Sequence, residues 1–290
     1  MDLQGFRDRA EAEAFHVREY QPSLLIDDPE GIRQRWWQMS EAARREQACV
    51  LDVRYGPGER ELLDVFPAQA PSPAALVFIH GGYWRSLDRR WFSFLARSFN
   101  DMGASCFMPS YGLAPQTPME DIVAQAAASV RWVHENAARY GADPGRLVVV
   151  GHSAGAHLLA TILAGRAPGL DAMPEDWIRG ALAISGVYDL RPLLLVPFLN
   201  ADLQLTAEQA EALSPALSRP AGRTPLWTSV GGIEPGEFHR QTRLLEQQWP
   251  EVWTGAIEMP ASNHLSILDE LAVRGSPLNE ALANMVDGTR

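Results

Sequence analysis

The spacing of apolar and polar positions divides the chain into alternating strand-like and helix-like stretches. Strands are predicted at 74–79, 104–109, 146–150, 178–184, 225–230 and 252–259, and an antiparallel pair at 48–66. Helices are predicted at 88–102, 118–140, 154–164, 237–248 and beyond 265. The runs at 74–79 and 146–150 are almost wholly apolar, as in strands buried on both faces of a parallel sheet. This order predicts an α/β fold, a mostly parallel sheet with helices on both faces.

Two segments do not follow this alternation. Residues 1–47 are mostly polar and helix-prone, and Asp27-Asp28-Pro29 offers a helix start through an N-cap followed by proline. Residues 190–220 are rich in leucine and proline and interrupt the strand–helix order. We therefore expect a single domain over residues 1–290, in which the segments 1–47 and 190–220 form a small lid over the carboxyl ends of the strands.

Composition and charge narrow the classes of partner. The 290 residues are 46% apolar, which suffices for one large core with a small lid. The formal net charge of −11 repels phosphate backbones, so nucleic-acid binding is not expected. The same charge mildly disfavours a strongly anionic substrate, although a local pocket can override the field of the whole molecule.

Cysteines, histidines and apolar runs give no sign of a disulfide scaffold, a metal site or a membrane span. Cys49 and Cys106 make no disulfide framework or CxxC motif, and the histidines lack ligand spacing, so we expect no metal or other cofactor. Residues 1–20 lack the apolar region of a signal peptide, and no run approaches the roughly 18 apolar residues of a membrane span. We expect a soluble cytoplasmic protein without a membrane partner, and leave a homodimer open.

Gly151-His152-Ser153-Ala154-Gly155 matches the pattern G-x-S-x-G, and its context makes the match informative. It follows the strand at 146–150 directly and opens the helix at 154–164, which is the arrangement of a nucleophile elbow. The tight turn would lift the Ser153 hydroxyl above the sheet at a helix N-terminus, where the Ala154 N–H can stabilise an oxyanion. The pattern predicts an α/β-hydrolase fold with Ser153 as the catalytic nucleophile.

A second glycine motif, His80-Gly81-Gly82-Tyr83-Trp84, follows the buried strand at 74–79. Adjacent glycines let the backbone approach a ligand with its N–H groups exposed. This is the loop in which α/β-hydrolases place the other half of the oxyanion hole, so Gly81 and Gly82 are the expected donors, with the Tyr83 N–H as a further option. His80 is expected to be a structural, hydrogen-bonding residue.

A serine nucleophile needs a base, and in this fold the acid and then the base follow the serine along the chain. His264 lies in the loop after the strand that ends near Met259, where the base is expected. His239 falls inside a predicted helix beside Arg240 and is expected on the surface. The sequence therefore predicts His264 as the base.

The acid is expected in the loop after the strand at 225–230, where Glu234 and Glu237 both qualify. Glu237 fits better as the first turn of the next helix, because a carboxylate suits the positive end of a helix. Glu234 is the predicted acid, and it would orient His264 and stabilise its imidazolium. Asp189, at the end of an earlier strand, is the alternative, with a structural or lid-positioning role expected for it.

These motifs together resemble those of the α/β-hydrolase kynurenine formamidases, which are relatives of the hormone-sensitive-lipase-like esterases. The motif at 80–84 is similar to their HGGxW signature, and Tyr111-Gly112-Leu113-Ala114-Pro115 is similar to a Y-x-L-A-P stretch of the wider group. Residues 237–241 resemble the segment that follows the catalytic acid. The resemblance runs from about residue 75 to residue 270.

Carried over by position, the resemblance implies Ser153 as nucleophile, Glu234 as acid and His264 as base. It departs from the family pattern at the acid, which is usually Asp in the formamidases. The implied small-molecule substrate is an aryl formamide such as N-formylkynurenine, with a role in tryptophan catabolism. A short-chain carboxylesterase of the same fold is the alternative, and a binding module without chemistry is disfavoured because all three triad residues are present.

An aryl formamide has a small acyl group and a large aromatic leaving group, so an aromatic pocket is expected beside the oxyanion loop. The residues placed to line it are Tyr83, Trp84 and Tyr188. The lid candidates are Trp36, Trp37 and Phe198. No side chain stands out as a partner for a substrate carboxylate, and Arg85, near the loop, equally suits a solvated charge.

Overall fold

An eight-stranded sheet runs through the computed structural model, which describes residues 5–70, 73–170, 173–174 and 176–288. The strands are β1 (Val50–Arg54), β2 (Leu62–Phe66), β3 (Ala74–Ile79), β4 (Ala104–Pro109), β5 (Asp143–His152), β6 (Ile178–Ile184), β7 (Leu226–Gly231) and β8 (Trp253–Met259). They lie in the order β1-β2-β4-β3-β5-β6-β7-β8. β2 pairs antiparallel with β1 and β4, and every pair from β4 to β8 is parallel. The predicted mostly parallel α/β sheet is confirmed.

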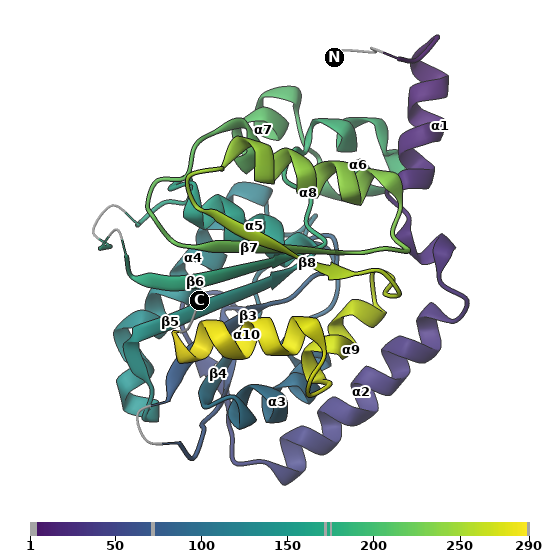
Figure 1. Cartoon of the computed structure of the whole chain (residues 1–290). Helices are drawn as coiled ribbons and strands as arrows, with labels where there is room; N and C mark the ends of the chain where they lie inside the picture. The colour runs from purple at the N-terminus through teal and green to yellow at the C-terminus, as the bar shows by residue number, and fades with distance from the viewer. Residues whose placement is uncertain (1–4, 71–72, 171–172, 175, 289–290) are drawn as a thin grey trace.

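Helices cover both faces of this sheet, as Figure 1 shows. One face carries α4 (Met119–Asn136), α5 (Ala154–Leu163) and α8 (Gly236–Gln248), and the other carries α3 (Ala96–Asp101), α9 (Ser266–Ala272) and α10 (Pro277–Asp287). Successive strand side chains point to opposite faces, so β3 supplies Val77 to one apolar core and Phe78 to the other. The alternation therefore fixes a three-layer molecule with a buried central sheet.

The stretch 88–102 differs from the helix that its sequence predicts. It forms two short 3₁₀ turns, Arg89–Trp91 and Ser93–Leu95, before the short helix α3. The Ser40 hydroxyl causes the break, because it donates to the Trp91 carbonyl at 2.9 Å and accepts from the Phe94 N–H at 3.1 Å. Backbone groups that would continue a helix are thus bonded to a side chain from a distant segment.

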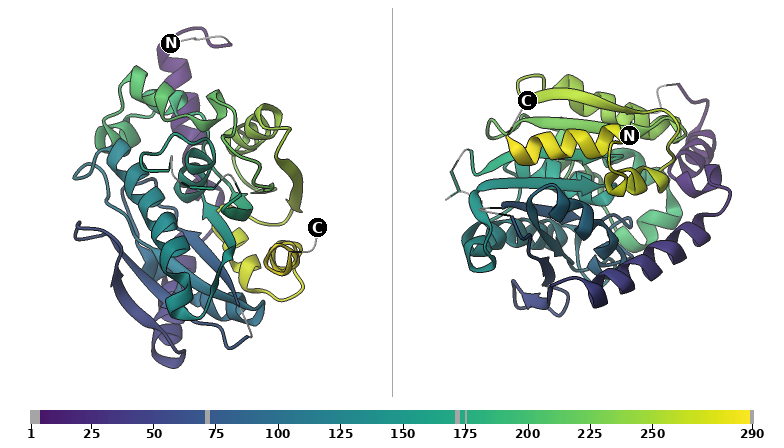
Figure 2. Two further views of the ribbon diagram at one scale, coloured as in Figure 1. Left: turned by 90° about the vertical axis from the view of Figure 1, so that its left-hand side faces the viewer. Right: turned by 60° about the horizontal axis from the view of Figure 1, so that its bottom comes forward.

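The N-terminal segment wraps one side of the sheet and does not join it (Figures 1 and 2). It contains α1 (Arg9–Glu19), a 3₁₀ turn (Pro22–Leu25) and α2 (Pro29–Glu46); Asp28 caps α2 by accepting from the Gly31 N–H at 2.8 Å. Residues 1–4 of the predicted lid segment lie outside the described residues. Within the described ranges, no helix is long and apolar enough to cross a membrane.

The second predicted lid segment, 190–220, forms a small group of helices above the sheet. It holds 3₁₀ turns at Arg191–Leu195 and Pro215–Leu217 around α6 (Pro197–Leu203) and α7 (Ala207–Ala212). α7 begins at a reciprocal capping box between Thr206 and Gln209. Leucines of this segment pack into the core shared with α4 and α5, so it is a fixed part of the domain.

Candidate active site

The turn between β5 and α5 holds Ser153 in a strained backbone conformation. Its φ is 55° and its ψ is −118°, in a region that costs a residue other than glycine about 1–3 kcal/mol. The turn is tight because β5 ends at His152 and α5 begins at Ala154. A Cβ at Gly155 would lie 2.0 Å from the Ile79 carbonyl oxygen, so only glycine fits there. This is the predicted elbow geometry, with the serine raised above the strand ends.

Ser153, His264 and Glu234 form a continuous hydrogen-bonded chain. Ser153 Oγ lies 3.1 Å from His264 Nε2, and His264 Nδ1 lies 2.6 Å from Glu234 Oε2. All three residues are buried. They follow β5, β8 and β7 respectively; β7 and β8 are neighbours in the sheet, and β6 lies between β5 and β7. Because a carboxylate only accepts, Nδ1 carries the proton, and Nε2 is left to accept the serine proton.

Two further groups hold the carboxylate of Glu234. Its Oε1 accepts from the Ser185 hydroxyl at 2.5 Å and from the Gly231 N–H at 2.7 Å. Ser185 follows β6 directly, and its φ of 51° is a second strained position at the strand ends. Sequence reasoning missed Ser185, although Ser185-Gly186 stands at the same kind of strand end as the other site residues.

The other candidate acids and base are engaged elsewhere. Glu237 lies in the first turn of α8, where it accepts from the Tyr20 hydroxyl at 2.8 Å and pairs with Arg240 at 2.7 Å. Asp189 pairs with Arg191 at 2.9 Å. His239 lies within α8 and lines a separate hollow on the surface. The structure thus brings only Glu234 to His264.

The loop after β3 passes close beneath the serine. A Cβ at Gly81 would lie 3.0 Å from Ser153 Cβ, and Gly82 has a φ of 118° that strongly favours glycine. Both glycines line the same pocket as Ser153. Ala154 is the first residue of α5, so its N–H has no carbonyl one turn earlier in the helix to bond. Of the three predicted oxyanion donors, Gly81 and Ala154 therefore lie next to the serine, and Gly82 lines the same pocket.

His80 and His152 are both buried beside this loop, and each has a defined partner. Burial lowers the pKa of His80 to about 4, while its Nδ1 lies 2.7 Å from the Gly81 carbonyl oxygen and its ring stacks on Tyr111 at 4.4 Å. Burial and the neighbouring His264 hold the pKa of His152 well below its usual value. His152 Nε2 donates to the backbone carbonyl of His264 at 2.9 Å. His80 is thus a neutral structural residue, and His152 holds the loop that carries His264.

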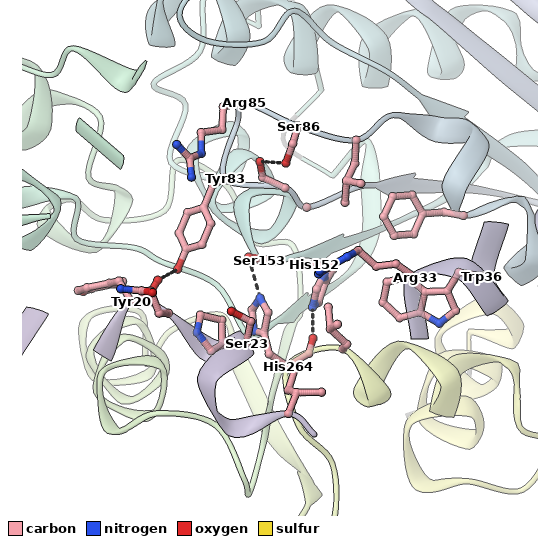
Figure 3. Close-up of a pocket in the computed structure, with 18 of the residues that line it drawn as sticks. Tyr20, Ser23, Arg33, Trp36, Tyr83, Arg85, Ser86, His152, Ser153 and His264 are labelled. Atoms are coloured by element: carbon pink, nitrogen blue, oxygen red, sulfur yellow. Dashed lines mark hydrogen bonds between the residues drawn. The ribbon is translucent and has the colours of Figure 1, made fainter. Parts of the chain in front are cut away.

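A pocket of about 540 Å³ opens over Ser153 (Figure 3). The oxyanion loop, both lid segments and the loop of His264 contribute to its wall. The lining side chains from the N-terminal segment include Tyr20, Ser23, Ile26, Arg33 and Trp36, and Phe198 comes from the 190–220 segment. The sequence predicted Trp36 and Phe198 as lid candidates, but gave no signal for Tyr20 or Arg33.

Of the three predicted substrate contacts, only Tyr83 lines this pocket. Trp84 is wholly buried and packs edge-on against His157 with ring centres 5.0 Å apart. Tyr188 is also wholly buried, folded back over Gly186. The prediction of Trp84 and Tyr188 as pocket residues is therefore corrected.

Two other residues near the pocket have contacts that the sequence did not specify. Trp37 packs against Trp91 with ring centres 4.9 Å apart and does not line the pocket. Arg85 is no solvated charge, because it pairs with Asp202 at 2.5 Å and donates to the Phe198 carbonyl at 2.7 Å. Arg85 thus fastens α6 to the oxyanion loop.

The fold and this arrangement define a class of protein. A model of the family with the α/β-hydrolase fold matches residues 76–231, more than half of the chain. The described residues contain no group of three or more His, Cys, Asp or Glu that could hold a metal ion, and the site is built from a serine, a histidine and a carboxylate. The chain belongs to the α/β-hydrolase family.

Proteins with similar sequences and structures indicate which members of the α/β-hydrolase family this chain resembles. Kynurenine formamidase of Danio rerio is 30% identical over 259 residues, which are 85% of each chain. Esterase LipQ of Mycobacterium tuberculosis is 33% identical over 172 residues, or 54% of this chain and 41% of that one. The crystal structure of a candidate thioesterase from Silicibacter sp. tm1040 matches with a TM-score of 0.80 at 29% identity, covering 93% of this chain and 98% of the other. This protein is a hydrolase homologous to the kynurenine formamidases.

Proposed function

We propose that this protein is a serine hydrolase that cleaves small aryl formamides of the N-formylkynurenine type through an acyl-enzyme. The observation that carries the proposal is the chain from Ser153 through His264 to Glu234, opening on a pocket walled by Tyr83 and Trp36. The relatives named as kynurenine formamidases support the substrate class. The cytoplasmic location and a homodimer stay predictions.

In the proposed reaction, Ser153 Oγ attacks the formyl carbon while His264 Nε2 takes the serine proton. The N–H groups of Gly81, Gly82 and Ala154 hold the oxyanion of the tetrahedral intermediate. His264 then returns the proton to the aryl nitrogen as the C–N bond breaks. Water attacks the formyl-serine ester with His264 again as base, and formate leaves as Ser153 regains its proton. Glu234 stabilises the imidazolium in both halves.

A short-chain carboxylesterase is the second candidate. The same triad would serve it, and the relative named esterase LipQ, which matches over 54% of the chain, favours it. The two candidates differ in the acyl group, which is formyl or a short acyl chain, and in the leaving group, which is an aryl amine or an alcohol.

The test compares hydrolysis of N-formylkynurenine with that of p-nitrophenyl acetate by wild type, Ser153→Ala and a matched control, Ser23→Ala. Ser23 lines the same pocket outside the triad. We expect kcat/KM above about 10⁴ M⁻¹s⁻¹ for the formamide, loss of activity in Ser153→Ala, and a change of at most a few-fold in Ser23→Ala. Cleavage of the ester alone would favour the esterase, and full activity in Ser153→Ala would overturn both candidates.

A further inference from the structure

The wall of the pocket carries a charge opposite to that of the whole chain. The chain has a net charge of −11, yet the pocket is lined by two arginines, Arg33 and Arg85, and its lining in the described residues includes no Asp or Glu. Arg85 is neutralised by Asp202 and bonded to the Phe198 carbonyl. Arg33 therefore supplies the positive charge that is open to a ligand.

Arg33 has spare hydrogen-bonding capacity. It lies on α2, and its side chain is 32% exposed. Its Nε contacts Glu30 at 3.2 Å, and the Glu30 side chain is 64% exposed, so solvent weakens this pair. Within the part of the chain that the structure describes, its terminal amino groups have no hydrogen-bond partner. A guanidinium with both of these groups free can bind a carboxylate with two parallel hydrogen bonds.

The position of Arg33 in the pocket would allow its free guanidinium groups to contact the leaving group of a substrate. Figure 3 shows Arg33 beside Trp36, reaching from the side of α2 toward His152 and Ser153. Trp36, Phe92 and Leu265 form an apolar part of the pocket wall. A substrate whose carbonyl lies at Ser153 can thus place an aromatic leaving group along this wall, with a polar substituent at Arg33.

We propose that Arg33 determines specificity by binding a carboxylate on the leaving group of the substrate. The proposal rests on the proposed serine-hydrolase function and narrows its substrate class to aryl formamides that carry a carboxylate side chain. Arg33 touches no reacting atom in this scheme. It lowers KM for the charged substrate and leaves the bond-breaking steps to the triad.

The experiment uses two formamides with the same reacting group. N-formylkynurenine carries the carboxylate, and 2′-formamidoacetophenone lacks the amino-acid side chain. For Arg33→Gln we expect kcat/KM to fall roughly 10- to 100-fold for the first substrate, mainly through KM, and to change less than about two-fold for the second. Arg33→Lys should restore part of the loss. The control is Arg45→Gln, an exposed arginine on the same helix, which should leave both substrates unchanged.

An inhibition assay separates this inference from the proposed formamidase activity. Kynurenine and 2′-aminoacetophenone are each added as competitors of p-nitrophenyl acetate hydrolysis. If wild type cleaves neither formamide, the formamidase proposal fails, but selective loss of kynurenine inhibition in Arg33→Gln still supports the carboxylate site. If Arg33→Gln weakens inhibition by the charged and the neutral compound equally, Arg33 has a structural role. If it weakens inhibition by neither compound, Arg33 has no role in binding. Either result overturns the inference.

Discussion

The carboxylate of Glu234 is held at both of its oxygens, and each oxygen has a separate task. Oε2 faces His264, while Oε1 receives the Ser185 hydroxyl and the Gly231 N–H. Glutamate is longer than the aspartate that the resemblance to the formamidases implies at this position, and a longer side chain has one more torsion to fix. The two bonds to Oε1 restrict that torsion, so the departure from the family pattern keeps a defined geometry.

Removing the Ser185 hydroxyl tests this account. Ser185→Ala should lower kcat roughly 10-fold, because a hydrogen bond to a charged group contributes about 1.5–3 kcal/mol and the freed carboxylate holds His264 less well. KM should change little. The measurement is steady-state kinetics with p-nitrophenyl acetate.

Ser93→Ala is the matched control for this variant. Ser93 is another buried serine, and its hydroxyl has no hydrogen-bond partner within the described residues. Its removal should leave kcat unchanged. If Ser185→Ala were as active as Ser93→Ala, the proposed support of Glu234 by Ser185 would be wrong.

At the scale of residues, the sequence was sufficient to predict the site residues that follow strands. It was not sufficient to predict residues whose place in the site depends on the direction of their side chains. Ser153, Glu234 and His264 each lie within the first five residues after a recognisable strand, so chain order helped to select them. Trp84 lies in an equally recognisable loop, but its side chain is buried against His157, and residue type does not reveal that. Arg33 belongs to a helix whose position over the site is set by tertiary packing alone.

At the scale of elements, Tyr20 joins the N-terminal segment to two other parts of the fold, α8 and the loop after β3. Its hydroxyl donates to Glu237 on α8 at 2.8 Å and accepts from Gln241 at 2.8 Å. Its backbone carbonyl accepts from the Tyr83 hydroxyl in the oxyanion loop at 2.7 Å. One residue thus fixes the pocket wall relative to both α8 and the oxyanion donors.

Tyr20→Phe should lower the free energy of unfolding by about 1–3 kcal/mol, because Glu237 and Gln241 each lose a partner in a buried site. Urea unfolding at neutral pH measures the change. Tyr140→Phe is the control, since the Tyr140 ring packs against Phe107 and Trp132 and its hydroxyl has no hydrogen bond among the described residues. Equal stability of the two variants would contradict the anchoring role of Tyr20.

Strands and most helices of the sheet region could be predicted because their apolar periods are strong and local. The stretch 88–102 could not, since Ser40, about fifty residues earlier, bonds the backbone groups that a helix would use. For the same reason, the sequence identified the segments 1–47 and 190–220 as additions to the sheet but not which of their side chains line the pocket.

At the scale of the whole molecule, buried neutral histidines couple stability to pH. Burial lowers the pKa of His80 and of His157 to about 4, and lowers that of His152 as well. The unfolded chain binds protons at these groups below about pH 6.5, whereas in the folded chain His80 and His157 do so only near pH 4. The contribution of these neutral histidines to the free energy of unfolding is therefore fully present above about pH 6.5 and is lost as the pH falls toward 4.

The expected loss is about 2 kcal/mol per histidine between pH 7 and pH 5 for His80 and His157. Urea unfolding at the two pH values measures it. His157→Gln removes one titrating group while keeping a donor for the Leu213 carbonyl, so the difference between the two pH values should shrink by about 2 kcal/mol in this variant. An unchanged difference would show that His157 does not contribute.

The contact between Tyr20 and Glu237 also bears on the order in which the protein is made. The two residues are 217 positions apart, so at about 5–20 residues per second Tyr20 emerges from the ribosome roughly 10–45 s before its partner. During that interval α8 is not available to pack against α1 and Tyr20. Trp36 on α2, in contrast, has its aromatic partners Phe92 and Phe94 well before the pocket is complete. The part of the N-terminal segment around α1 and Tyr20 is thus among the last to dock, although it is synthesised first, and a nascent chain has no finished binding pocket until translation is nearly complete.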